Sequence, residues 1–204
     1  GDTCKDNGLL KITDNLAPSN PYGASKAAID LYMQERMTNG FINGFVTRAF
    51  AHTGPRRGYN FSISSDACQI AKMKLGIQEK VLQVGNLQTE RVVIDVRDCV
   101  NAYYLLMTTD ESSGKVFNVC GNVNNVHKME YFTNLLIKSA GYNQSEVVKE
   151  INPKFYRPID IQIQIGDSTE LRNMTGWDTT ISIEQTMDDL LDYLVVKRSW
   201  KLDG

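Results

Sequence analysis

The sequence predicts an α/β fold, and three observations lead to that prediction. Strand-like and helix-like patterns alternate along the 204 residues, as they do in α/β domains. Hydrophobic residues make up 42% of the chain, which allows one large core or two small ones. The formal net charge is −2, with 22 basic and 24 acidic residues. Because binding to a phosphate backbone requires a surplus of clustered Lys and Arg, this balance excludes a general nucleic-acid-binding protein.

The first half of the chain contains two predicted helices. The first helix is predicted to begin at Pro21. Proline lacks a backbone N–H, and it is favoured at the first position of a helix because an N–H there would have no hydrogen-bond partner within the helix. Gly76 ends the second, after an apolar stripe of helical spacing. The predicted elements are a helix over 21–37, a strand over 45–50, a Gly, Pro and Arg-rich loop over 52–59, a helix over 62–76 and a strand over 81–84.

The second half continues the alternation. Residues 159–165 alternate apolar and polar side chains, which is typical of a half-buried strand. Ser182 and Gln185 have the spacing of a capping box at the start of the last helix. The predicted strands are 92–96, 115–120 and 159–165, and the predicted helices are 98–108, 129–140, 168–175 and 182–196, before a tail over 197–204.

The spacing of the cysteines and the hydropathy of the chain give expectations about metal binding and about the cellular location of the protein. Cys4, Cys68, Cys99 and Cys120 are too far apart for a CxxC motif, so no metal site is expected. Cys68 and Cys99 fall within apolar helical patterns, which indicates reduced core cysteines. No stretch is apolar for long enough to span a membrane and no signal peptide is visible. We therefore expect a reduced, cytoplasmic protein.

Tyr22 and Lys26 form the most informative pair. They are four residues apart, so on a helix they share one face. A lysine near a phenol stabilises the phenolate, which can then exchange a proton with a sugar hydroxyl or carbonyl oxygen. The same lysine can donate a hydrogen bond to a nicotinamide ribose. The alternative is an exposed Tyr and Lys on an ordinary amphipathic helix, because this spacing is common.

The segments around this pair resemble the extended short-chain dehydrogenase/reductase family. The resemblance lies in Asn20-Pro-Tyr-Gly-Ala-Ser-Lys26, in Arg48-Ala-Phe50 and in His52-Thr-Gly-Pro55. Residues 55–61, 74–80, 84–91, 156–160 and 166–177 are similar to GDP-mannose 4,6-dehydratases. Residues 52–55, 117–120 and 186–193 are closer to the sister GDP-4-keto-6-deoxymannose reductases.

This resemblance implies a catalytic and cofactor site. Tyr22 would be the catalytic acid/base, with Lys26 as its electrostatic partner, and both would contact the cofactor, NADP or NAD. His52 and Arg57 match positions that contact NADP in the dehydratases. A guanidinium suits phosphate oxygens, whereas the alternative for Arg57 is a solvated basic loop.

The resemblance also implies a site for a GDP-sugar. Asn86, Arg91, Arg157 and Asp160 match substrate positions, with arginines for the diphosphate and a carboxylate for a guanine or sugar edge. Surface ion pairs are the alternative for the charged residues, and a turn is the alternative for Asn86. Trp177 is expected to pack the final helices rather than to stack on a base. A homodimer or homotetramer is also implied.

The chain departs from the family in two places. Ala51 stands where the family usually has Asn, so one contact to the nucleotide sugar is absent or replaced. The sequence has no GxGxxG turn, which normally holds the dinucleotide phosphates. The resemblance therefore implies the back half of a Rossmann-type doubly wound sheet plus a smaller α/β substrate-binding domain. Residues 1–58 would be a remnant of the dinucleotide-binding domain, and 59–196 mainly substrate-binding, with some elements returning to the Rossmann sheet.

Three functions stay open. The first is an NAD(P)-dependent enzyme acting at C4 of a GDP-hexose, of the GDP-mannose 4,6-dehydratase type. The second is a GDP-4-keto-6-deoxymannose reductase. The third is a non-catalytic nucleotide-sugar-binding fragment that lacks the cofactor half, and the 204 residues alone are expected to be inactive.

Overall fold

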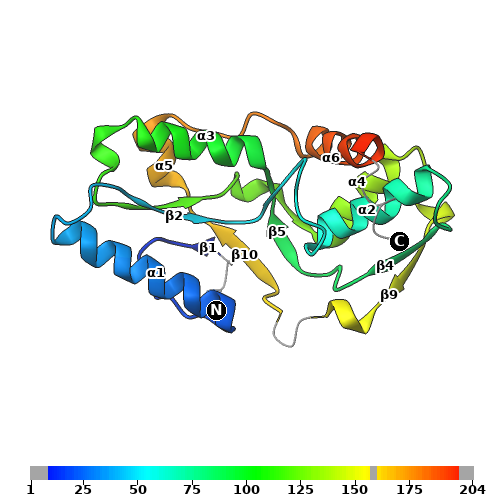
Figure 1. The fold of residues 1–204 in the computed structure, drawn as a ribbon, viewed down its shortest axis with the longest axis horizontal. Helices are drawn as coiled ribbons and strands as arrows, with labels where there is room; N and C mark the ends of the chain where they lie inside the picture. The colour runs from blue at the N-terminus through cyan, green and yellow to red at the C-terminus, as the bar shows by residue number, and fades with distance from the viewer. Residues whose placement is uncertain (1–8, 157–159, 198–204) are drawn as a thin grey trace. The chain divides into compact units, whose positions relative to one another are not determined.

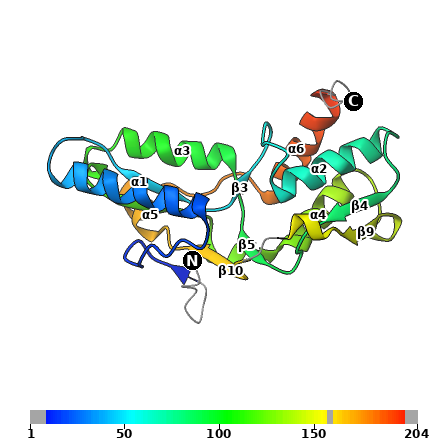
Figure 2. The same ribbon diagram turned by 60° about the horizontal axis from the view of Figure 1, so that its bottom comes forward.

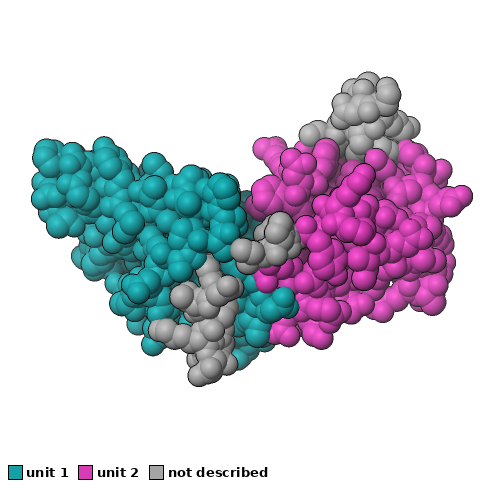
Figure 3. Space-filling model, turned by 90° about the horizontal axis from the view of Figure 1, so that it is seen from below, with its two compact units in different colours: residues 1–52, 91–126, 161–180 teal, residues 53–90, 127–160, 181–204 magenta. Residues whose placement is uncertain are grey.

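The computed structural model describes residues 9–156 and 160–197. The chain forms two compact units (Figure 3). Unit 1 consists of residues 1–52, 91–126 and 161–180, and unit 2 of residues 53–90, 127–160 and 181–204. Both units combine helices with parallel strand pairs, which confirms the α/β class.

Unit 1 places parallel strands between helices. Figure 1 shows α1 on one side of its strands and α3 with α5 on the other. Strand β1 pairs with β10 and β2 with β7, both in parallel. The elements of this unit are β1 (Leu9–Leu10), α1 (Pro21–Thr38), β2 (Val46–Ala49), β6 (Ile94–Asp95), α3 (Val96–Met107), β7 (Val116–Val119), β10 (Ile163–Gly166) and α5 (Thr169–Thr175), with 3-10 turns at Asp110–Ser112 and Val123–Asn125.

The core of unit 1 lies between α3, α5 and the strands. Phe117, Leu106 and Leu171 have no exposed surface. Trp177 is 2% exposed, and its indole nitrogen donates to the Asp98 carbonyl at 2.9 Å. Trp177 is therefore a packing residue, as expected, but it packs with residues of α3 and α5 rather than between the last two helices.

The chain passes between the two units at five points, and three of these points lie within short strands. They are β3 (His52–Thr53), β5 (Glu90–Val92) and β8 (Val126–Lys128). Strand β3 pairs with β6, and the largest sheet has the order β1-β10-β5-β8.

Unit 2 is a helical layer beside a two-stranded parallel sheet (Figure 2). Ile70, Leu136 and Leu191 come from three different helices and are fully buried, because each helix turns its apolar face toward the other two. The elements are α2 (Ser62–Lys74), β4 (Val81–Val84), α4 (Met129–Ser139), β9 (Val148–Ile151) and α6 (Ile183–Lys197), with 3-10 turns at Gln144–Glu146 and Pro153–Phe155.

Two predicted strand boundaries are wrong. In place of the strand predicted over 92–96, the chain forms β5, which ends at Val92, and a separate strand β6 that ends at Asp95. The Asp95 carboxylate accepts from the Arg97 backbone nitrogen at 2.7 Å, so helix α3 begins at Val96, two residues before its predicted start. The strand predicted over 159–165 is observed only from Ile163. The carbonyls of the two residues before it accept hydrogen bonds from the Arg91 side chain, so they do not contribute to a strand ladder.

The structure also bears on the expectations about reduced cysteines and about membrane-spanning helices. Cys68, Cys99 and Cys120 are free thiols, as expected for the first two, whereas Cys4 lies outside the described residues. Within the described ranges, none of the helices combines the length and the apolar character needed to cross a bilayer.

Candidate functional site

Helix α1 brings Tyr22 and Lys26 together. Asn20 caps the helix, and its side-chain oxygen accepts from the Gly23 backbone nitrogen at 2.7 Å. Tyr22 therefore lies in the first turn, with Lys26 one turn later. The Lys26 Nζ atom is 5.6 Å from the centroid of the Tyr22 ring, and Tyr22 is 73% exposed. The structure thus places the two predicted catalytic residues side by side on an accessible helix face.

A buried ion pair fixes α1 against the neighbouring strand. Asp30 is buried on α1, and Arg48 of β2 donates to its two oxygens from Nε at 2.7 Å and Nη2 at 3.1 Å. Arg48 also donates from Nη1 to the Ile12 carbonyl at 2.9 Å. Sequence reasoning missed this pair, although a carboxylate inside an apolar helix was a signal for it. The pair orients the helix that carries Tyr22.

His52 lies on β3, three residues after the end of β2. Its Nδ1 atom is 2.9 Å from the Phe50 carbonyl oxygen. The described part of the chain supplies no hydrogen-bond partner to its Nε2 atom. The ring is therefore held from one side by the backbone of unit 1.

The arginine loop belongs to unit 2. The Arg57 guanidinium carbon is 3.7 Å from the centroid of the Phe61 ring, which is a close cation–π contact. Arg56 has a φ of 73°, a conformation that costs energy in a non-glycine residue. The loop is thus a structured turn rather than an extended basic segment.

Asn86 and Asp160 meet in unit 2. The Asn86 Nδ2 atom donates to Asp160 Oδ2 at 3.1 Å, although 74 positions separate the two residues. The Asn86 side-chain oxygen accepts from the Gln88 backbone nitrogen at 3.0 Å, so Asn86 is also a turn residue. Two of the residues predicted for the substrate are therefore adjacent.

Arg91 is positioned by backbone oxygens of unit 1. It donates to the Ile161 carbonyl at 2.6 Å and to the Gln162 carbonyl at 3.2 Å. The suggested alternative of a simple surface ion pair does not account for these two contacts. Arg157 lies outside the described residues. The substrate roles of Arg91 and Arg157 stay predictions.

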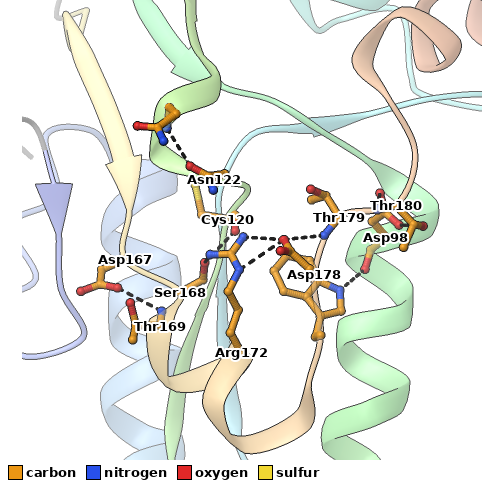
Figure 4. A network of polar contacts seen from close by, with 12 residues as sticks. Asp98, Cys120, Asn122, Asp167, Ser168, Thr169, Arg172, Asp178, Thr179 and Thr180 are labelled. Carbon is orange, nitrogen blue, oxygen red and sulfur yellow. Dashed lines mark hydrogen bonds and ion pairs between the residues drawn. The ribbon is translucent and has the colours of Figure 1, made fainter.

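A polar network of unit 1 organises the end of β10 and the start of α5 (Figure 4). Arg172 donates to Ser168 Oγ at 2.7 Å and to Asp178 at 2.8 Å, and Ser168 Oγ donates to the Cys120 carbonyl at 2.7 Å. Burial raises the pKa of the Cys120 thiol to about 11, so it is neutral and can accept a hydrogen bond. This network is structural: it fixes the segment that follows Gly166.

Asp66 is a buried carboxyl group of unit 2 that the predicted site does not use. Burial raises its pKa to about 7, against the opposing effects of the Thr133 hydroxyl and Lys149. The Thr133 hydroxyl donates to Asp66 Oδ2 at 2.8 Å. Lys149 itself contacts Asn134 at 2.6 Å and Glu130 at 3.2 Å.

Comparison with known proteins decides the family. Residues 5–190 match the family model described as GDP-mannose 4,6 dehydratase. The chain belongs to the GDP-mannose 4,6-dehydratase family. It is 35% identical over 175 residues to GDP-6-deoxy-D-mannose reductase of Pseudomonas aeruginosa, covering 85% of this chain and 55% of that protein. It is 28% identical over 197 residues to human GDP-mannose 4,6 dehydratase, covering 89% of this chain and 52% of that protein.

Solved structures confirm the Rossmann-type fold of this family member. The structure of RMD from Pseudomonas aeruginosa complexed with NADPH has a TM-score of 0.79 at 29% identity, over 89% of this chain and 58% of that one. UDP-glucose 4-epimerase of Thermotoga maritima has a TM-score of 0.79 at 23% identity, over 98% of this chain and 60% of that one, which concerns the fold alone. The chain spans about half the length of the curated relatives it matches.

Proposed function

We propose that the full protein is an NAD(P)-dependent enzyme that acts at C4 of a GDP-hexose, of the GDP-mannose 4,6-dehydratase type. The observation that carries the proposal is the pairing of Tyr22 with Lys26, whose Nζ atom lies 5.6 Å from the Tyr22 ring centroid. Family membership supports the substrate class, since the matching relatives are dehydratases and reductases of GDP-sugars.

The residues present fit a nicotinamide dinucleotide. Lys26 offers N–H donors to ribose hydroxyls beside an exposed phenol, and Arg57 offers a guanidinium to phosphate oxygens. His52 would contact the same cofactor with the side of its ring that Phe50 leaves open. When bound, NADP supplies the hydride chemistry.

Tyr22 handles the proton in this proposal. In the oxidising direction the phenolate accepts the proton of the C4 hydroxyl while the C4 hydrogen leaves as hydride. In the reducing direction the phenol donates its proton to the C4 carbonyl oxygen. Lys26, whose Nζ atom lies 5.6 Å from the centroid of the Tyr22 ring, is proposed as the electrostatic partner of the Tyr22 oxygen in both directions. In a dehydratase, water would then leave across C5 and C6, the hydride taken from C4 would be returned to C6, and a proton would be added at C5.

Four residues are proposed to bind the substrate. Arg91 and Arg157 are proposed for the diphosphate, and Asn86 with Asp160 for hydrogen bonds to a guanine or sugar edge. The Asn86–Asp160 hydrogen bond supports this assignment, because it orients the carboxylate. We assign Tyr22, Lys26 and His52 of unit 1 to the cofactor, and Asn86 and Asp160 of unit 2 to the sugar nucleotide.

A GDP-4-keto-6-deoxymannose reductase is the second candidate. The 35% identity to the Pseudomonas aeruginosa reductase favours it. Such an enzyme needs only the reducing half of the chemistry, with Tyr22 as the proton donor. A binding module without redox chemistry is the third, and Ala51 in place of the family Asn favours it.

One experiment separates the three functions. The full-length protein is incubated with GDP-mannose and NADP in one arm, and with GDP-4-keto-6-deoxymannose and NADPH in the other. Loss of one water from GDP-mannose, read by mass spectrometry, supports the dehydratase. Oxidation of NADPH in the second arm alone supports the reductase. Binding of GDP-mannose without turnover in either arm refutes both enzymatic proposals.

Assembly and location belong to the same proposal. A homodimer or homotetramer is supported by apolar residues exposed on α1, among them Ile29 and Tyr32. The free thiols Cys68, Cys99 and Cys120 support a reducing, cytoplasmic location.

A further inference from the structure

Gly166 lies directly beneath the ring of Phe50. A Cβ atom at position 166 would lie 2.6 Å from Phe50 Cδ2 and Cζ, and closer still to Cε2. Atoms of real side chains do not approach to this distance, so only glycine fits at position 166 while Phe50 stays in place. The φ of Gly166 is not in the left-handed region. The requirement is therefore one of space rather than of backbone conformation.

The Gly166 backbone cannot move aside to make room. Its nitrogen donates to Cys120 Sγ at 3.3 Å, and its position on β10 pairs with Leu10 of β1. The next residue, Asp167, donates from its nitrogen to the Leu10 carbonyl at 2.8 Å. Figure 4 shows Cys120 and Ser168 meeting beside this point. A larger residue at 166 would therefore displace Phe50.

The backbone at Phe50 is held on both sides. The Phe50 nitrogen donates to the Val119 carbonyl at 2.9 Å, and the Ala51 carbonyl accepts from the Ile94 nitrogen at 3.1 Å. These hydrogen bonds orient the Phe50 carbonyl group toward the His52 ring, and its oxygen lies 2.9 Å from the His52 Nδ1 atom. A carbonyl oxygen only accepts hydrogen bonds, so Nδ1 must carry the proton. In the neutral ring, Nε2 is then an acceptor.

We propose that Gly166 and Phe50 are positioning residues for His52: they hold its Nδ1–H on the Phe50 carbonyl, so that Nε2 accepts a hydrogen bond from an O–H or N–H group of the bound nicotinamide nucleotide. The cofactor part of this proposal rests on the proposed function. The tautomer part rests only on unit 1, in which all three residues lie.

The tautomer can be measured without any substitution. The imidazole nitrogen signals of His52 in the ¹⁵N-labelled full-length protein are assigned by their loss from the spectrum of a His52→Gln variant, and the tautomer is then read from the wild-type spectrum. At about pH 8.5, two units above the ordinary pKa of imidazole, we expect His52 to have the shifts of a ring protonated at Nδ1. A His52 ring protonated at Nε2 in the wild type overturns the proposal, whatever the variants do.

Substitutions at 166 and 50 test the positioning. We expect Gly166→Ala to reduce the Nδ1-protonated population and to raise the Kd for NADPH about tenfold, the loss that one hydrogen bond produces. The double variant Gly166→Ala/Phe50→Ala removes the ring that the new methyl group meets, while the carbonyl at position 50 remains. It should restore the Nδ1 tautomer.

Gly44→Ala is the matched control, because its Cβ would make only an ordinary contact of 3.7 Å with Ile42. It should change neither the tautomer nor the Kd. Wild-type His52 signals in Gly166→Ala, or no recovery in the double variant, refute a positioning role. If Gly166→Ala alone does not fold, the double variant still tests the positioning role.

The acceptor role of Nε2 has its own variants. The side-chain oxygen of Gln reaches the position of Nε2, whereas that of Asn reaches only the position of Nδ1. We expect His52→Gln to bind NADPH within a few-fold of wild type and His52→Asn to lose about tenfold. Equal losses in both contradict the acceptor role. If NADPH binds nowhere on the wild-type protein, the proposed function fails, while the measured tautomer still decides the positioning.

Discussion

Tyr22 combines an exposed side chain with a neighbouring cation, and no other described tyrosine on α1 has that arrangement with a lysine. In the full-length enzyme, Tyr22→Phe removes the group that exchanges the proton but keeps the ring. We expect kcat to fall by about 10²- to 10⁴-fold, the usual contribution of a general acid/base, with little change in the Kd for NADPH. Steady-state kinetics and fluorescence titration measure the two effects. Tyr32→Phe on the same helix is the control, and retained turnover in Tyr22→Phe would remove Tyr22 from its assigned role.

Asp66 makes the stability of the protein depend on pH. Its pKa of about 7 in the folded protein lies above the usual aspartate value of 3.8, so the folded state binds a proton more tightly than the unfolded chain. The contribution of this carboxyl is therefore most favourable below the unfolded pKa and is lost as the pH rises toward 7. The groups around the carboxylate are Thr133 from α4 and Lys149 from β9, and Lys149 contacts Glu130 and Asn134.

Asp66→Asn replaces the ionisable carboxyl with a neutral amide, so the loss of stability at high pH no longer occurs. The amide keeps an oxygen that can accept from the Thr133 hydroxyl. We expect it to raise the free energy of unfolding at pH 8 by a few kcal/mol, since one pKa unit corresponds to about 1.4 kcal/mol, and to have a smaller effect at pH 5. Urea denaturation at both pH values measures the difference. Asp188→Asn, an exposed position on α6, should show no such dependence. An equal effect of Asp66→Asn at the two pH values would contradict the prediction.

At the scale of elements, α1 is the unusual helix. Most of its residues are at least partly exposed, and only Asp30 and Met37 are buried. Its attachment to β2 therefore depends on the Asp30–Arg48 ion pair and the contact of Arg48 with the Ile12 carbonyl. A buried pair of this kind orients an element even where it adds little net stability.

Breaking the Asp30–Arg48 ion pair should lower the stability of the folded protein. Arg48→Met leaves the Asp30 carboxylate buried without its cation, and we expect the free energy of unfolding to fall by about 3–5 kcal/mol. Adding Asp30→Asn should recover part of that loss. Glu35→Gln, which breaks an exposed ion pair with Arg36, should have little effect on the free energy of unfolding, because solvent screens exposed charges. Equal losses in Arg48→Met and Glu35→Gln would show that the Asp30–Arg48 pair does not hold the helix.

At the scale of the whole molecule, α1 exposes several large apolar side chains. Ile29 is 61% exposed and Tyr32 is 57% exposed, and they are three residues apart on one helix face. Clusters of this kind mark surfaces that bind another protein. This face is the one that we propose for self-association.

Ile29→Lys places a charge in that face. If the full-length protein is a homodimer or homotetramer through α1, we expect the variant to sediment as a smaller species than the wild type. Val196→Lys, at an exposed position of α6, should sediment as the wild type does. An unchanged sedimentation coefficient for Ile29→Lys would exclude α1 from the interface.

The helices could be predicted closely because their signals are local. Pro21 with its apolar periodicity gave the start of α1, and the Ser62 helix and the strand 81–84 agree with the observed elements. Strands β1 and β9 could not be found, because each is short and exists through pairing with a partner distant in the chain. The same holds at the site: the YxxxK spacing placed Tyr22 beside Lys26, but nothing local indicates that Asn86 meets Asp160.

The sequence by itself determined the family, the α/β class and the Tyr22–Lys26 pair, because motif spacing and helical periodicity are properties of neighbouring residues. Only the tertiary structure decided that Arg48 holds Asp30, that Arg91 is held by the carbonyls of residues 161 and 162, and that Gly166 makes room for Phe50 beside His52. These contacts join segments tens of residues apart. They depend on strand register and on the space left by a missing side chain, which no local pattern encodes.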